Sequence, residues 1–333
     1  GSYSEVVSVV EAVLAGDKPT RRGAISAPLY DTPRAVSTGP NWAYLRIAEG
    51  CDNRCAYCVI PSLRGKFRSR TKESILEEAR LLAASGVKEL IIVAQDITRY
   101  GIDLYGKVCL TELLKELCKL DFRWVRLHYL YPELIDNELI DEIASEDKIV
   151  KYLDIPIQHI NDTILRRMNR RGTGEEIRAL FKKLREQIPG LVLRTSLITG
   201  LPGEGEAEFE ELCDFLREAK IERAGVFPYS PEEGTPAALM PDRCSTEEAQ
   251  RRAELCMEIQ AEIMDGFAET FIGRELDVLV MGREPDGTPW GRSEYDSPDI
   301  DSRVIFSGDA APGDMVRVRI DSVDDGELIG EQI

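Results

Sequence analysis

Between Trp42 and about Phe271, short apolar runs alternate with stretches in which apolar residues recur every three or four positions. Such runs predict buried strands and such stretches predict amphipathic helices. About six strand–helix units in series are typical of parallel strands joined by crossover helices. Because a closed barrel of this kind has about eight units, we expect an open, partial (β/α)6 barrel with its chemistry at the carboxyl ends of the strands. The strand candidates are WAYLRIAEG, KELIIVAQD, WVRLHYLYP, KYLDIPIQH, LVLRTSLIT and RAGVFPYS.

Two helix starts carry the sequence of a capping box, in which a hydroxyl residue is followed three positions later by a glutamate. Thr173 with Glu176 opens the helix after the fourth strand, and Ser245 with Glu248 opens a long helix that we expect to run to about Phe271. These two helix starts mark where the helices after the fourth and the sixth predicted strands begin.

The pattern changes on both sides of this region. After Gly273, five short alternating runs separated by Gly, Pro and Asp predict a small antiparallel β-barrel of about five strands. At the other end, a helix over residues 5–15 and a loop rich in Pro, Gly and Ser predict a tail or linker. We therefore expect three parts: residues 1–41, the partial barrel 42–272, and the β-barrel 273–333.

Charge is unevenly distributed. The chain has a net charge of −18, and residues 275–333 contain fifteen acidic residues, five arginines and no lysine. A phosphate-binding surface needs clustered positive charge, so RNA binding by the terminal barrel is not expected. An acidic solubilising cap and a docking surface for a basic protein both remain open. No apolar run approaches the length of about 20 residues that spans a membrane. Scattered cysteines and the lack of a secretory signal favour the cytoplasm.

Three cysteines, Cys51, Cys55 and Cys58, have the spacing CxxxCxxC directly after the first predicted strand. Structural zinc usually has four ligands, and the two histidines, His128 and His159, are distant in sequence. A redox pair of Cys55 and Cys58 leaves Cys51 unexplained. A four-iron cluster normally has four cysteines, so three leave one iron open to a substrate or cofactor. We favour the iron–sulfur cluster over zinc and over redox thiols.

The segment CDNRCAYCVIPSLRGKFRSR, with Tyr57 before its third cysteine, resembles the radical S-adenosylmethionine (SAM) superfamily and its methylthiotransferase branch. VAQDITRYG, LHYLYP, YLDIPIQH, LITGLPGE and FPYSPEEGTPA are similar to the RimO-type enzymes, which methylthiolate the β-carbon of an aspartate in ribosomal protein S-twelve. The resemblance runs from Trp42 onward and makes the terminal barrel TRAM-like. tRNA adenosine methylthiotransferases are one alternative, and a non-catalytic, metal-stabilised docking module is another.

The resemblance implies a 4Fe–4S cluster on the three cysteine thiolates, with SAM at the open iron and an electron donor to reduce the cluster. Candidate SAM contacts, chosen mainly by strand order, are Tyr57, Gln95, Asp96, Gln158, Arg194, Ser196 and Gly200. Further candidates near the substrate are Arg64, Arg68, Arg70, Tyr229 and Ser230. The basic ribosomal protein would dock on the acidic barrel.

Full-length methylthiotransferases carry an N-terminal domain with three more cysteines and a second cluster. Here no cysteine precedes Cys51. We therefore expect that this chain lacks that domain, that residues 1–41 are its remnant and linker, and that the chain binds one cluster, cleaves SAM and methylthiolates poorly.

Overall fold

The computed structural model describes residues 5–20, 35–39 and 41–333. Its centre is a six-stranded parallel sheet in the order β1-β4-β5-β6-β7-β8, which is also the order along the chain. The sheet has two free edges, as predicted for a partial barrel. Its strands are β1 (Trp42–Arg46), β4 (Glu89–Val93), β5 (Trp124–Leu127), β6 (Ile149–Asp154), β7 (Val192–Thr199) and β8 (Arg223–Pro228).

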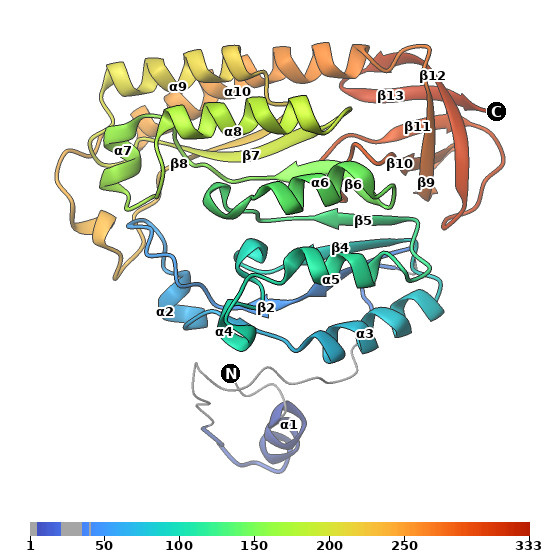
Figure 1. Ribbon diagram of the computed structural model, residues 1–333, viewed down its shortest axis with the longest axis horizontal. Coiled ribbons are helices and arrows are strands. Elements are labelled where there is room, and N and C mark those ends of the chain that lie inside the picture. Colours follow the sequence, from blue (N-terminus) through green and yellow to red (C-terminus); the bar gives the residue numbers. More distant parts are fainter. Residues whose placement is uncertain (1–4, 21–34, 40) are drawn as a thin grey trace.

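Helices cover the outer face of this sheet (Figure 1). A single apolar core lies between the two layers and includes Leu45, Leu90, Leu127, Leu153 and Leu197. The predicted helices form as α3 (Lys72–Ala84), α5 (Leu110–Leu117), α6 (Asn137–Ser145), α8 (Gly174–Gln187), α9 (Glu206–Ala219) and α10 (Thr246–Glu269).

Several short elements were not predicted, because one or two turns carry too few residues to show a period. They are α2 (Ile60–Arg64), α4 (Ile102–Tyr105), α7 (Asp162–Arg167), the 3-10 turns η2 (Ile97–Arg99), η3 (Pro132–Leu134) and η4 (Pro236–Leu239), and β3 (Arg68–Ser69). Its partner β2 (Ala48–Glu49) is the end of the predicted first strand, which the structure divides in two. The expected N-terminal helix forms as α1 (Val6–Leu14) and buries none of its residues. The described residues contain no helix long and apolar enough to cross a bilayer.

Only one of the two predicted capping boxes is complete. Thr173 Oγ1 accepts a hydrogen bond from Glu176 N at 3.2 Å, and Glu176 Oε2 accepts one from Thr173 N at 2.8 Å. At α10, Ser245 Oγ accepts from Glu248 N at 3.1 Å, but the Glu248 carboxylate instead pairs with Arg251 and Arg252. The second box is therefore a single cap, because two arginines of the following turn compete for the glutamate.

The terminal segment forms a closed five-stranded barrel in the order β10-β11-β13-β12-β9, with a core of its own. Four neighbouring pairs are antiparallel, as predicted, whereas β11 and β13 are parallel. The strands are β9 (Glu275–Arg283), β10 (Pro289–Arg292), β11 (Val304–Ser307), β12 (Met315–Asp324) and β13 (Glu327–Gln332). The predicted domain boundaries near residues 41 and 272 stay predictions.

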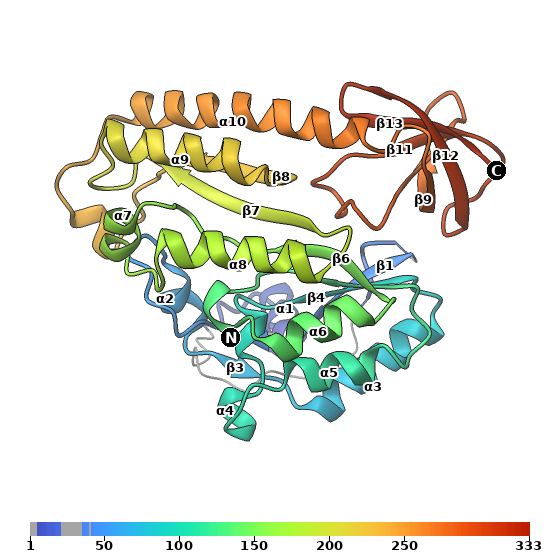
Figure 2. The same ribbon diagram turned by 45° about the horizontal axis from the view of Figure 1, so that its top comes forward.

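The barrel packs against the amino ends of the sheet strands. Figures 1 and 2 show it beyond the end of α10, at the opposite end of the sheet from α2. Trp124, Val150 and Val192 of the sheet form an apolar cluster with Leu279 of β9. The strands of the barrel thus lie away from the cysteine loop, although the loop between β10 and β11 reaches His128, which directly follows β5.

Candidate active site at the carboxyl ends of the strands

The three cysteines lie in a loop that follows β2. Gly50, just before them, has a φ of +83°, and a Cβ there would lie 2.1 Å from Lys66 O. Only glycine permits both this backbone conformation and such a close approach. Cys51 N then donates to Gly65 O at 3.1 Å, which holds the loop against the chain that returns from α2.

The other side of the cysteine loop is tied to two distant segments. Ala56 N donates to Met168 O at 2.8 Å, and Ala56 O accepts from Ala237 N at 2.9 Å. Asn169 Nδ2 donates to Arg54 O at 2.7 Å. Segments after β6 and β8 therefore fix the conformation of the loop, as expected for a site assembled at one end of a parallel sheet.

Gln95 and Asp96, which were predicted as SAM contacts, lie just after β4 and reach the cysteine loop. Gln95 Oε1 accepts from Gly50 N at 2.7 Å, and Asp96 Oδ2 accepts from Asn53 Nδ2 at 3.1 Å. Asp96 Oδ1 also accepts from Thr98 N and caps η2. Burial raises the pKa of Asp96, against the lowering effect of hydrogen bonds from Thr98 and Asn53. These acceptors hold the loop in place, and their contact with SAM stays a prediction.

Burial of the thiols disfavours their ionisation, so the binding of a cluster has to supply the free energy that ionises at least Cys51 and Cys58. All three are free, with Cys51 and Cys55 buried and Cys58 half-buried. Burial raises the pKa of Cys51 to about 11 and also raises the pKa of Cys58. Both are therefore protonated at neutral pH until metal binds, and binding releases the protons.

The surroundings do not provide a fourth ligand for a single zinc ion. In the described part of the chain, no three His, Cys, Asp or Glu side chains surround one ion position. His128 Nε2 lies 3.1 Å from Ser297 Oγ, and His159 Nε2 lies 3.3 Å from Glu204 Oε2, so each histidine has another partner. Three thiolates that bind three different irons do not need to meet at one point. The residues present therefore fit an iron–sulfur cluster better than zinc.

Two residues that sequence reasoning missed contact Cys55. Arg170 Nη1 lies 3.8 Å from Cys55 Sγ, and Tyr131 Oη lies 3.6 Å from the same sulfur. Both line a cavity of about 190 Å³ beside the loop, together with Glu133 and Asn169. Tyr131 belongs to the LHYLYP motif, whose resemblance to the family does not single out this tyrosine. Arg170 lies in no recognised motif, so the sequence alone does not indicate it as a site residue.

The predicted residues of β7 are brought to the inner face of the sheet. Arg194 and Ser196 are half-buried there, and Ser196 O accepts from Gln158 N at 2.9 Å. Gln158 has a φ of +72°. Arg194 Nη1 donates to Asp154 Oδ1 at 2.7 Å. Against the effect of burial, Asp154 raises the pKa of Arg194. Asp154 of β6 is thus the carboxylate partner of Arg194, and contact of Gln158, Arg194 and Ser196 with SAM stays a prediction.

Gly200 is explained by packing. Its φ is +74°, and a Cβ there would lie 2.4 Å from Ala249 Cβ on α10. The close approach is therefore to a helix, and contact of Gly200 with SAM stays a prediction.

Tyr57 and Tyr229 lie together in an apolar cluster, and burial raises the pKa of both phenols. Ser230 is exposed at the end of β8.

The basic residues after the cysteines differ in their surroundings. Arg64 is partly exposed and pairs with Glu49 at 2.9 Å, and Arg68 Nη1 donates to backbone carbonyls of its own loop. Arg70 is buried, and its guanidinium binds Glu78 and Arg46 O. Glu78 therefore holds the Arg70 guanidinium inside the protein, and a role of these arginines near the substrate stays a prediction.

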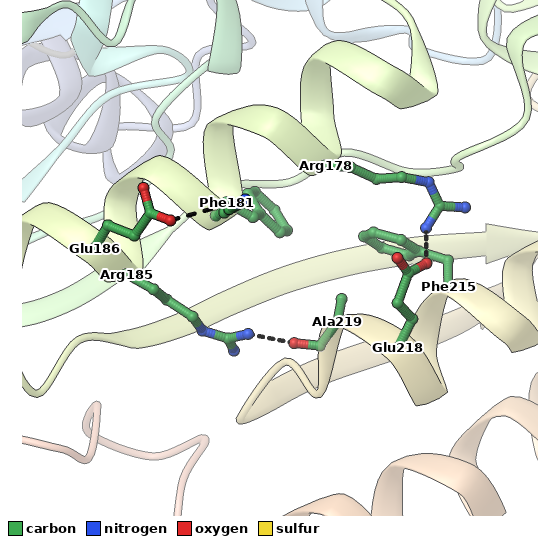
Figure 3. A pocket seen from close by; sticks show the side chains of 8 residues that line it. Arg178, Phe181, Arg185, Glu186, Phe215, Glu218 and Ala219 are labelled. Carbon is green, nitrogen blue, oxygen red and sulfur yellow. Dashed lines mark hydrogen bonds and ion pairs between the residues drawn. The ribbon is translucent and has the colours of Figure 1, made fainter.

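A second hollow lies between α8 and α9, on the outer surface (Figure 3). Its volume is about 350 Å³, and Phe181 and Phe215 form its apolar wall. Arg178 pairs with Glu218 across it, and Arg185 donates to Ala219 O. This hollow lies on the helix layer and shares no lining residue with the cavity beside Cys55.

Comparison with known proteins agrees with this geometry. Residues 45–216 match the family model of the Radical SAM superfamily, and residues 272–333 match that of the TRAM domain. Two solved structures show a similar fold. They are the radical SAM methyltransferase TsrM from Kitasatospora setae (TM-score 0.53, 18% identity, 71% of this chain and 52% of that one) and coproporphyrinogen III oxidase HemN from Escherichia coli (TM-score 0.52, 20% identity, 68% and 54%).

Curated relatives match over nearly the whole chain. The ribosomal protein uS12 methylthiotransferase RimO of Caldanaerobacter subterraneus is 47% identical, with 99% of this chain and 76% of that protein covered. The RimO proteins of Pelotomaculum thermopropionicum (49%, covering 100% and 76%) and Geotalea uraniireducens (50%, covering 99% and 75%) are similarly close. The chain therefore belongs to the RimO family of ribosomal protein uS12 methylthiotransferases, within the radical SAM superfamily.

Proposed function

We propose that this chain cleaves SAM and docks the substrate in the methylthiolation of the β-carbon of an aspartate in ribosomal protein uS12. One 4Fe–4S cluster would be held by the thiolates of Cys51, Cys55 and Cys58. The observation that carries this proposal is the set of three free thiols, without a fourth, at the carboxyl end of a partial barrel. Three thiolates leave one iron available to SAM.

The target bond explains why such a cofactor is needed. An aspartate β-carbon that bears only hydrogen and carbon has no proton acidic enough for general base catalysis near neutral pH. When bound, the cluster supplies the electron that cleaves SAM reductively and so starts radical chemistry. The chain itself holds the cysteine loop through Gln95 and Asp96, and it packs Tyr57 of that loop in an apolar cluster with Tyr229.

The terminal barrel is proposed as the docking surface for the basic substrate. Most of its exposed arginines pair with acids of the same barrel, since Arg317 contacts Asp277 at 2.9 Å and Arg319 contacts Glu331 at 2.9 Å. Arg283 and Arg303 are paired in the same way. Among the described arginines of residues 273–333 that are exposed, Arg274 alone has no carboxylate partner, and it contacts the rings of Phe271 and Tyr295. One such arginine does not form the clustered positive charge that RNA phosphates need, which supports a protein substrate over tRNA.

The sequence count overstates the acidity of this surface. Asp296 and Asp301 are turned toward the sheet, where both lie near Arg223. The acids left exposed include Asp321, Asp324, Asp325 and Glu331, on and around the β12–β13 hairpin. We propose this hairpin as the centre of the docking surface. We also propose that the protein acts in the cytoplasm and that a separate low-potential protein donates the electron.

SAM cleavage tests the proposed chemistry. After anaerobic reconstitution, we expect about four irons per chain and release of 5′-deoxyadenosine on reduction. Cys55→Ala should abolish both. Cys118→Ala, which changes another buried cysteine outside the loop, should preserve both. Zinc in place of iron, about eight irons per chain, or cleavage by Cys55→Ala would contradict the proposal.

Binding tests the proposed substrate. Purified uS12 should be retained by the chain more strongly than unmodified tRNA, with an affinity that falls as salt increases. The double variant Asp324→Asn/Asp325→Asn should weaken retention of uS12. Stronger retention of tRNA, with uS12 unaffected by this variant, would favour tRNA modification instead.

A further inference from the structure

We propose that Arg170 is a positioning residue that raises the reduction potential of the cluster through its contact with the sulfur of Cys55. The proposal rests on the cluster site proposed above and not on the identity of the substrate.

The guanidinium of Arg170 is fixed on three sides. Nη1 faces Cys55 Sγ at 3.8 Å, and Nη2 donates to Pro156 O at 2.6 Å. Its central carbon lies 4.5 Å from the centre of the Tyr131 ring. The residue is 8% exposed, so it has little freedom to leave this position. A planar group held in this way presents a fixed N–H and a fixed positive charge to the sulfur.

Arg170 differs from the other buried arginines in its partner. The described residues include six buried arginines, and the other five each pair with a carboxylate. Those five are Arg70, Arg126, Arg223, Arg252 and Arg292. For Arg170, no carboxylate among the described residues forms an ion pair, and its charged edge meets a cysteine. A buried cation without a counter-ion is costly, so an anionic cysteine ligand would compensate it.

Tyr131 strengthens the same local environment. Its hydroxyl lies 3.6 Å from Cys55 Sγ, while its ring stacks on Arg170. Arg170 and Tyr131 are thus polar neighbours of this sulfur that can donate hydrogen bonds, and the Tyr57 hydroxyl is a third. Among the described contacts, no arginine directly contacts the sulfur of Cys51 or Cys58, although the charge of Arg170 also acts on Cys58. The direct contact of Arg170 is therefore with one of the three ligands.

The expected consequence follows from charge. Reduction adds one electron to a cluster that three thiolates already make negative. A fixed cation and hydrogen bonds to sulfur favour the reduced state, and net charge and such hydrogen bonds are known determinants of cluster potential. Since the contact is buried, solvent screens it weakly. Arg170 would therefore make the cluster easier to reduce by a given electron donor.

Potentiometric titration of the reconstituted chain tests this inference, with the reduced cluster followed by electron paramagnetic resonance. Arg170→Met removes the charge and keeps the length of the side chain. At a fixed solution potential, we expect its ratio of reduced to oxidised cluster to fall at least tenfold, which corresponds to about 59 mV for a one-electron couple. Arg170→Lys should lie between this variant and the unmodified chain.

Arg171→Met is the matched control, because Arg171 lines the same cavity but is exposed. It should titrate like the unmodified chain. An unchanged potential in Arg170→Met would overturn the proposal, as would an equal shift in Arg171→Met.

Iron loading decides the outcome if the neutral variant is unstable. When Arg170→Met fails to retain iron, Arg170→Gln is titrated with the same criteria. Failure of both neutral variants while Arg170→Lys loads normally would still support a required positive charge. Failure of all three would overturn the proposal in favour of a purely structural role. The titration uses neither uS12 nor turnover, so a failure to cleave SAM or to bind uS12 would contradict the proposed function and leave this result intact.

Discussion

Arg223, the first residue of β8, and Asp296, in the loop between β10 and β11, form a buried ion pair in which Nη2 and Oδ1 are 2.8 Å apart. Beside it, Glu89 of β4 accepts from both Arg126 and Arg292. These contacts join the terminal barrel to the amino ends of the sheet strands through charge as well as apolar packing.

Breaking this pair should destabilise the whole chain. Asp296→Asn preserves shape but leaves Arg223 as a buried charge with weaker compensation, for which we expect a loss of about 3–5 kcal/mol in the free energy of unfolding. Urea denaturation followed by circular dichroism measures it. Asp309→Asn, which breaks the exposed pair with Arg283, should have no measurable effect. Equal stability of the two variants would show that the buried pair contributes nothing.

Gly50→Ala should disrupt the cysteine loop. The added Cβ meets Lys66 O, which is backbone and cannot move alone. Gly86→Ala is a close control, because Gly86 has a φ of +92° with nothing within 4 Å of the added Cβ. Both variants carry the backbone strain of about 1–2 kcal/mol, but only Gly50→Ala should lose iron after reconstitution. Iron content per folded chain is the measurement, and full loading of Gly50→Ala would refute the explanation.

Gln95 should affect the retention of iron through Gly50 N. Gln95→Leu leaves that N–H without its acceptor, which typically costs about 1–3 kcal/mol for a buried group. We expect iron loss to a chelator to be several-fold faster in Gln95→Leu. Gln95→Glu keeps an acceptor oxygen at the same place and should retain iron nearly as well as the unmodified chain. Identical rates in all three proteins would mean that this hydrogen bond does not hold the loop.

His128 should make stability depend on pH. Burial, with Arg126 and Arg194 nearby, lowers the pKa of His128 to about 3. Between about pH 6.5 and pH 3 the unfolded chain binds a proton at this residue and the folded chain does not. Stability should therefore fall as pH falls through this range, by up to about 1.4 kcal/mol per pH unit from this residue.

His128→Gln should remove this part of the slope and leave the contribution of the carboxylates. Urea denaturation of both proteins at several pH values gives the difference directly. Parallel curves for the two proteins would contradict the assignment.

Most of the fold was predictable, because its elements are long enough to show a period. The six parallel strands and the helices over residues 72–84 and 206–219 follow directly from apolar spacing. The parallel pairing of β11 with β13 did not, since both are short strands and their pairing depends on how the barrel closes. The second capping box failed for a local reason, because Glu248 has arginine partners three and four residues ahead.

The site was predictable only where neighbours in sequence are neighbours in space. The cysteine spacing and the placement of Gln95 at a strand end needed no tertiary information. The pairing of Arg194 with Asp154 depends on the register of β6 and β7, which a sequence pattern does not show. The contact between Arg170 and Cys55 joins residues 115 positions apart, so no local motif could indicate it.

The loop between β10 and β11 has a consequence for protein engineering. Chimeras that exchange the terminal barrel among relatives would have to keep Arg292 and Asp296 matched to Glu89 and Arg223 of the sheet. A graft that ignores this match would leave buried charges on both sides of the junction. The barrel and the sheet are thus joined by charges that match across the junction, although each has an apolar core of its own.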